Sequence, residues 1–171
     1  MSEENLHQRR AHEKYLEMAR GIPVAMMLTG LRQKPVHSIP MTPKRVQDDG
    51  EILFISNSTS ENNANLLSDS DCQLIFGDVR SKEFMNVYGS AYISSDQELI
   101  DDLWSNLDNN WFEGKNDPSI TVIRFRPRYG NYWDTKTNAL VTMAKLGYTA
   151  ITGNETEIGV KGTLQFNYQK N

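Results

Sequence analysis

The spacing of hydrophobic residues predicts a helix at the start of the chain. Between residues 7 and 23, apolar side chains recur every three or four positions, as they do on one face of a helix. These apolar positions are Ala11, Tyr15, Met18 and Ala19. Gly21 and Pro23 follow in the order typical of a helix end, with glycine at the cap and proline just beyond it.

Short apolar runs separated by polar turns then predict a series of strands. The runs cover residues 24–31, 34–41, 51–56, 72–79 and 84–94. Residues 32–34, 48–50 and 80–82 have the polar and glycine residues of tight turns. Strands joined by such turns pair as antiparallel neighbours, so the pattern favours an antiparallel sheet or barrel over a doubly wound fold.

Two helices are predicted on the outside of this sheet. Residues 61–71 form a short helix that exposes mostly polar groups and turns Leu66 and Leu67 inward. Ser95 and Glu98 form a capping box ahead of a longer helix over residues 99–112. The broad apolar face of the longer helix consists of Leu99, Ile100, Leu103, Trp104, Leu107 and Trp111.

The remaining sequence predicts another strand, a third helix and a closing element. Residues 120–127 are a strand that residues 129–134 extend or follow, residues 137–148 are a helix, and residues 157–168 are a last strand or arm. No repeat or linker divides the sequence, so we expect a single α+β domain over residues 1–171. Residues 1–22 form its N-terminal helix, and residues 135–171 hold its C-terminal helix and the strand or arm.

Composition and charge limit the possible functions. A chain of 171 residues can bury a core as one domain, and a net charge of −4 with a pI near 5.4 predicts binding to neither nucleic acid nor anionic membranes. No signal-peptide core or membrane-spanning run is present, so we expect a cytoplasmic protein. Cys72 is the only cysteine, which excludes an intramolecular disulfide, and its apolar neighbours predict a buried thiol.

Side chains suited to catalysis or to a metal site are sparse. The histidines His7, His12 and His37 are not spaced as metal ligands, and no zinc, phosphate-loop or serine-hydrolase motif is present. The adjacent Asp101 and Asp102 lie on an amphipathic helix, where a solvated face explains them best.

The polar turn within residues 55–67 is a candidate binding feature. It passes from an apolar strand through Ser, Thr and Asn residues into a helix, which suits either an anion or a helix cap. Because the turn carries no Lys or Arg, its residues alone favour capping over anion binding.

Five short motifs follow one another along the chain. They are Pro40-Met41, Asp49-Gly50, Ser56 with Ser60, Trp111-Phe112-Glu113-Gly114 with Asp117-Pro118, and Tyr132-Trp133-Asp134. In this order they resemble the general stress protein 26-like family of the pyridoxamine 5′-phosphate oxidase-like, FMN-binding split barrels. Residues 159–166 are also similar to the closing strand of that family.

The resemblance implies a six-stranded antiparallel split β-barrel with flanking helices. It also implies a homodimer that holds FMN, a flavin nucleotide, in two symmetric clefts between its subunits. The positions implied to bind the cofactor are Ser38, Ile39, Pro40, Met41, Ile55, Ser56, Asn57, Ser60, Asn62, Trp111 and Trp133. Apolar and aromatic residues among them would line the isoalloxazine ring, although Trp111 could instead pack in the core at the end of its helix.

The phosphate end departs from the pattern of the family. A gapless alignment puts Ile39 and Asn62 where typical members carry an Arg and a Lys that meet the phosphate. Neutral donors that could offset this loss are Ser56, Asn57 and Ser60, and cations that could reach the site are Lys44, Arg45 and Lys82.

Three functions are compatible with these features. The first is an FMN-binding, flavin-dependent oxidoreductase of the general stress protein type, in which the cofactor supplies the redox chemistry. The alternative, favoured by Ile39 and Asn62, is a non-catalytic dimeric split-barrel module that has lost tight flavin binding. A third, haem or another planar ligand on the same scaffold, rests on fold analogy and lacks a convincing axial histidine.

Overall fold

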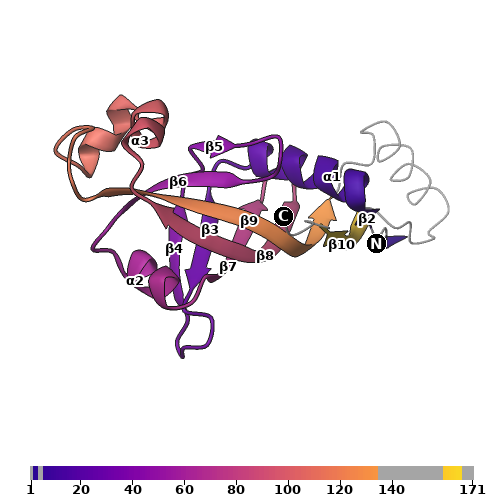
Figure 1. The fold of residues 1–171 in the computed structure, drawn as a ribbon. Helices are drawn as coiled ribbons and strands as arrows, with labels where there is room; N and C mark the ends of the chain where they lie inside the picture. The colour runs from indigo at the N-terminus through magenta and orange to yellow at the C-terminus, as the bar shows by residue number, and fades with distance from the viewer. Residues whose placement is uncertain (1, 4–5, 135–159, 167–171) are drawn as a thin grey trace.

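A mostly antiparallel sheet that curls into a split barrel forms the body of the molecule (Figure 1). The computed structural model describes residues 2–3, 6–134 and 160–166. The strands are β1 Ser2–Glu3, β2 Leu6–His7, β3 Ala25–Thr29, β4 His37–Met41, β5 Arg45–Val46, β6 Ile52–Asn57, β7 Asp71–Asp78, β8 Glu83–Ser94, β9 Ile120–Asp134 and β10 Val160–Gln165. The helices are α1 Gln8–Gly21, α2 Glu61–Ser68, α3 Gln97–Leu103 and the 3₁₀ helix η1 Asn106–Asn110.

The order of the strands confirms the predicted antiparallel split barrel. From one edge the sheet runs β4-β3-β7-β8-β9, and every neighbouring pair in this run is antiparallel. The far edge of β9 pairs first with β6 and then with β10. Within the described residues, seven strands are longer than two residues, one more than the six expected.

A β-bulge marks the place where β9 changes partner. Its pairing with β6 ends at Phe125 and its pairing with β10 begins at Tyr129. Between them, the register with β8 shifts at Tyr88 and Gly89, so that β9 gains one extra residue. Pro127 lies in this gap, where the missing backbone N–H of proline costs the sheet least.

The main core lies inside the barrel and is closed by α1. Alternate residues of the strands point inward, and the apolar stripe predicted for the opening helix packs against them. Tyr15 is fully buried, and its hydroxyl donates a hydrogen bond to the carbonyl of Gly50 at 2.9 Å. The predicted helix and its end at Gly21 are therefore confirmed. Burial of Cys72 is confirmed as well, and burial raises the pKa of its thiol to about 12.

The helix predicted over residues 99–112 is wrong in its length and in its cap. Asp96, not Ser95, caps α3 by accepting a hydrogen bond from the backbone N–H of Glu98 at 3.0 Å. The chain leaves helical geometry at Trp104 and re-enters η1 two residues later. The first part of the predicted apolar face packs outside the barrel against β6 and β9, in a cluster made of Leu53, Ile100, Leu103, Ile120 and Val122. The second part is exposed.

The inward face predicted for α2 is also partly wrong. Leu66 is buried, but Leu67 is 78% exposed. On a helix, positions three and four residues before Leu66 share its face, and these are Asn63 and Asn62. The helix therefore buries amides where the sequence predicted a polar, solvated surface.

The C-terminal predictions are only partly covered by the structure. The strand expected at residues 120–127 and its extension form one continuous strand, β9, and β10 confirms a strand within residues 157–168. The helix predicted over residues 137–148 lies outside the described residues. In the part of the chain that the structure covers, no helix has the length and apolar character needed to cross a membrane.

Candidate functional site

The polar turn between β6 and α2 caps the helix. The hydroxyl of Ser60 accepts a hydrogen bond from the backbone N–H of Asn63 at 3.3 Å, which satisfies one of the free donors of the first turn. Ser56 lies 3.3 Å from the same hydroxyl and donates to the side-chain carbonyl of Asn63 at 3.0 Å. The favoured interpretation from the residues, helix capping, is therefore confirmed for Ser60.

The two positions at which the family resemblance expects cations, Ile39 and Asn62, both adjoin Met27. Ile39 is the cross-strand partner of Met27 in the β3–β4 pair. The side-chain amide of Asn62 donates to the sulfur of Met27 at 3.8 Å, and its carbonyl accepts from the hydroxyl of Thr29 at 3.2 Å. The amide of Asn65 donates to the same hydroxyl at 3.2 Å. We call Met27, Thr29, Ile39, Asn62 and Asn65 the Asn62 cluster.

Strand β4 forms an open edge beside the Asn62 cluster. Its described residues pair only with β3, and the side chains of Ser38 and Pro40 are exposed. Proline has no N–H for a ladder bond, so the backbone at Pro40 is expected to face away from β3. His37, at the start of the strand, lies 3.2 Å from the carboxylate of Glu61 in α2. This contact brings β4 next to the start of the helix.

Two other apolar candidates, Met41 in β4 and Ile55 in β6, pack inward. Met41 is half-buried against the main core, and Ile55 is half-buried against the cluster beneath α3. Both therefore have one side in the protein interior.

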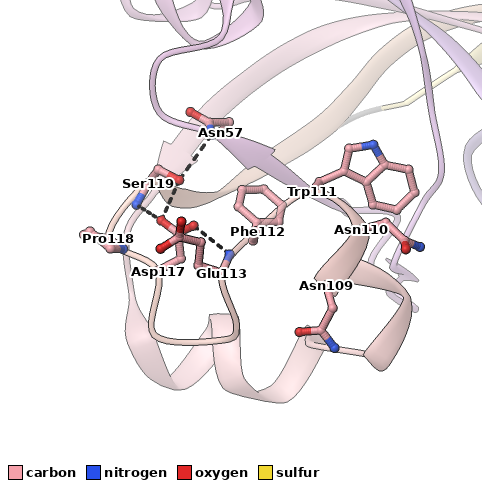
Figure 2. Close-up of a pocket in the computed structure, with 9 residues that line it drawn as sticks. All are labelled: Asn57, Asn109, Asn110, Trp111, Phe112, Glu113, Asp117, Pro118 and Ser119. Atoms are coloured by element: carbon pink, nitrogen blue, oxygen red, sulfur yellow. Dashed lines mark hydrogen bonds between the residues drawn. The ribbon is translucent and has the colours of Figure 1, made fainter.

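A cleft of about 620 Å³ opens on the other side of the polar turn (Figure 2). It is lined by Asn57, Asn109, Asn110, Trp111, Phe112, Glu113, Asp117, Pro118 and Ser119. The amide of Asn57 donates to the hydroxyl of Ser119 at 3.2 Å, which ties the end of β6 to the wall of the cleft. Two of the predicted cofactor residues, Asn57 and Trp111, thus line one cleft.

Asp117 shapes this wall. Its carboxylate accepts hydrogen bonds from the backbone N–H of Glu113 and from both the N–H and the hydroxyl of Ser119, at 2.7 to 3.0 Å. These donors, the Glu113 N–H first, lower the pKa of Asp117. The cleft lining contains two carboxylates and neither Lys nor Arg, so its charge favours neutral or cationic groups over anions.

Trp111 is held at the mouth of the cleft by η1. Its side chain is 73% exposed, so the alternative that it packs in the core is wrong. Asp108, buried in η1, accepts hydrogen bonds from the N–H and hydroxyl of Ser105 and pairs with Lys44 at 2.6 Å. This arrangement fixes η1 against β5, the strand that begins directly after Lys44.

Trp133 lies far from Ser56 and Trp111 within one chain. It stands in β9 twelve residues after Thr121, the partner of Ser56, which corresponds to roughly 40 Å along the strand. Its side chain is 37% exposed and is paired across the sheet with Phe84. The fold therefore separates the two tryptophans that the resemblance assigns to the cofactor.

The three basic side chains considered as replacements for the missing Arg and Lys pair with other residues or lie in another turn. Lys44 is engaged by Asp108, and Arg45 pairs with Asp102 at 2.6 Å. Lys82 lies in the turn that joins β7 to β8, at the end of β7 away from α2.

Sequence reasoning missed the amide and carboxylate walls of the cleft. Asn109, Asn110 and Ser119 were not singled out, and Asp117 was noted only as part of a motif. The signal was present in two places: Ser105 with Asp108 has the spacing of a capping box, and Asp117 with Ser119 has that of an Asx-turn.

In sequence the chain is similar to known proteins of one family. The sequence profile described as pyridoxamine 5′-phosphate oxidase like matches residues 10–157. General stress protein 26 of Bacillus subtilis (strain 168) is 30% identical over 131 residues, covering 71% of this chain and 87% of that relative.

Two solved structures establish the shared fold. A protein of Jannaschia sp. CCS1 described as a general stress protein 26 superposes with a TM-score of 0.75 at 20% identity, covering 90% of this chain and 97% of its own. The general stress FMN/FAD binding protein of Xanthomonas citri superposes with a TM-score of 0.65 at 22% identity, covering 77% of this chain and 93% of its own.

Proposed function

Because the chain belongs to the pyridoxamine 5′-phosphate oxidase-like family, we propose that it is a flavin-binding protein, FMN being the form that the resemblance implies. One observation carries the proposal: β4 and the start of α2, which are distant in sequence, converge around Met27. These are the segments in which the cofactor residues are expected. The related Xanthomonas citri protein, of the same fold, is named for binding FMN or FAD.

The residues present suit the flavin ring better than its phosphate. The open edge of β4 offers unpaired backbone groups for the polar edge of an isoalloxazine, and Trp111 offers an exposed aromatic face. At the phosphate end, Ser56 and Ser60 are neutral donors already engaged in the helix cap. The fit is therefore good for the ring and poor for a doubly charged phosphate.

As an enzyme the protein would be a flavin-dependent oxidoreductase of the general stress protein type. A bound flavin supplies the electron-transfer chemistry, and the chain's own residues bind it, orient it and limit the access of water. The alternative is a non-catalytic dimeric module that has lost tight flavin binding, which the neutral residues Ile39 and Asn62 favour.

We further propose a homodimer located in the cytoplasm, built from one domain over residues 1–171. Support for the dimer comes from the outer face of the sheet, where Met26 is paired with Ile75 and Phe84 with Trp133, all of them partly exposed. Apolar side chains gathered on one face often mark an interaction surface.

A visible absorption spectrum of the purified protein tests the proposed function. We expect flavin bands that persist after FMN is added and the protein is desalted, together with a rise in melting temperature in excess FMN. A protein that stays colourless and gains no thermal stability from FMN would support the non-catalytic module instead.

A further inference from the structure

In the gapless alignment with the family, the Asn62 cluster includes both positions, Ile39 and Asn62, at which typical members carry the cations that meet a flavin phosphate. Met27, Thr29 and Asn62 are fully buried, and Asn65 nearly so. Their polar groups are satisfied by one another: Thr29 donates to Asn62, and Asn65 donates to Thr29. The side-chain carbonyl of Asn65 also accepts from the amide of Gln33 at 3.2 Å. The site is therefore filled by a packed, neutral and hydrogen-bonded group of side chains.

The charges next to the cluster do not replace the missing cations. Glu61, the first residue of α2, adds a carboxylate at the position where a phosphate would approach the helix, and it pairs with His37. Lys44 and Arg45 are held by Asp108 and Asp102. A phosphate monoester carries a charge of about −1.5 to −2 at pH 7, and moving it here from water would cost hydration without a compensating ion pair.

We propose that this chain recognises a flavin through its ring and ribityl chain, and that the terminal phosphate adds nothing to affinity. Riboflavin should therefore bind at least as well as FMN. The inference rests on the proposed function and specifies its ligand. In a site with both cations, two charge-assisted hydrogen bonds would favour the phosphate by roughly 10²- to 10⁴-fold.

The test is a parallel titration of the full-length protein with riboflavin and with FMN. Quenching of flavin fluorescence monitors the binding. We expect riboflavin to bind more tightly than FMN or within about threefold of it, and FMN binding that does not weaken between roughly 50 and 500 mM salt, since no phosphate ion pair is there to be screened. FMN binding tenfold or more tighter than riboflavin, and weakening with salt, would overturn the inference and leave the proposed flavin binding intact. Binding of neither flavin would overturn both.

A variant with a restored cation gives a second, independent readout. Ile39 lies on an edge strand and is only half-buried. The guanidinium of Ile39→Arg can therefore reach the phosphate while the aliphatic part of the arginine side chain covers Met27. We expect it to favour FMN over riboflavin by roughly tenfold or more. The matched control Val36→Arg adds the same charge on an exposed position just before β4 and should leave the ratio unchanged. Equal effects of the two variants, or none from Ile39→Arg in a folded protein, would contradict the assignment of this site.

Discussion

The surroundings of Asn62 determine how a lysine at this position would behave. Asn62 is 0% exposed and bonds to Thr29 and Met27, so Asn62→Lys would bury an ammonium group and break both contacts. We expect the free energy of unfolding to fall by roughly 2–4 kcal/mol, because a desolvated charge lacks a partner there. Urea denaturation measures the loss. Ala64→Lys, on the exposed face of the same helix, is the control and should change stability by less than about 0.5 kcal/mol.

Trp111 offers a residue-scale test of the ring site. Its exposed side chain contributes little to folding, so Trp111→Ala should leave the melting temperature nearly unchanged. If the indole stacks on the flavin, the dissociation constant of the flavin should rise by roughly 2- to 12-fold, the equivalent of one aromatic pair. Leu107→Ala removes a similarly exposed apolar side chain from η1, the 3₁₀ helix that Trp111 directly follows, and should not affect binding. Equal losses in both variants would argue against stacking by Trp111.

At the scale of single residues, the sequence predicted properties that depend on neighbours in the chain better than burial that depends on distant contacts. Burial of Cys72 follows from its apolar neighbours, and the capping role of Ser60 follows from its place before a helix. The burial of Asn62 and the exposure of Leu67 depend on the rotation of α2 about its axis. That rotation is set by contacts of Asn62 and Asn63 with β3 and β9, which no local pattern contains.

The register of β8 against β9 depends on Gly89. A Cβ atom at this position would collide with the backbone oxygen of Arg126 beside the bulge, and backbone cannot move aside as a side chain can. Gly89→Ala should therefore destabilise the protein by roughly 3 kcal/mol or more, or prevent folding. Gly21→Ala is the control, because nothing lies within 4 Å of its added methyl group, and it should be neutral or slightly stabilising. Thermal unfolding of the two variants decides the matter, and equal stability would contradict the close packing.

The link between η1 and the barrel should weaken in acid. Burial opposes ionisation of Asp108, but hydrogen bonds from Lys44 and Ser105, and the charge of Lys44, outweigh it and lower the pKa of Asp108. Its contribution is then fully present above the unfolded pKa of about 3.9 and is lost as the pH falls through the folded value. Asp108→Asn should cost about 3 kcal/mol at pH 7 and progressively less below pH 4.

Urea denaturation of wild type and Asp108→Asn at pH 7 and pH 3 measures this change. Asp48→Asn is the control, since the side chain of Asp48 is almost fully exposed in its pair with Arg20 and should contribute less than about 1 kcal/mol. A cost of Asp108→Asn that is the same at both pH values would contradict the ion pair.

The division of the predicted 99–112 helix shows what periodicity leaves out at the scale of elements. The spacing of Leu99, Leu103 and Leu107 continues through the break, so the hydrophobic pattern alone favours one helix. The break arises at Ser105, whose backbone N–H is taken by the carboxylate of Asp108 while Lys44 holds that carboxylate from the barrel. The local capping signal was visible in the sequence, but its partner Lys44 lies 61 residues away from Ser105.

At the scale of the whole molecule, the pairing of β3 with β4 and of β7 with β8 was predictable, because the two strands of each pair are consecutive in the chain. The sharing of one edge of β9 by β6 and β10 was not, because both pairs join distant segments. The same limit applies to the site. The sequence identified β4 and the turn after β6 as its parts, whereas the convergence of Ile39 and Asn62 on Met27 is a property of the folded barrel.

Assembly is the last property to test, and it bears on the site through Trp133. One chain separates Trp133 from Trp111 by most of the length of β9, so both can contact one flavin only if a second subunit brings them together. We expect light scattering to give a mass near twice 19.5 kDa. Phe84→Asp, which places a charge on the partly exposed outer face beside Trp133, should yield monomers and lose flavin together. Leu67→Asp adds the same charge at a side chain of α2 that is 78% exposed, and it should retain the dimer. A wild-type monomer that binds flavin would show that one chain forms the site alone.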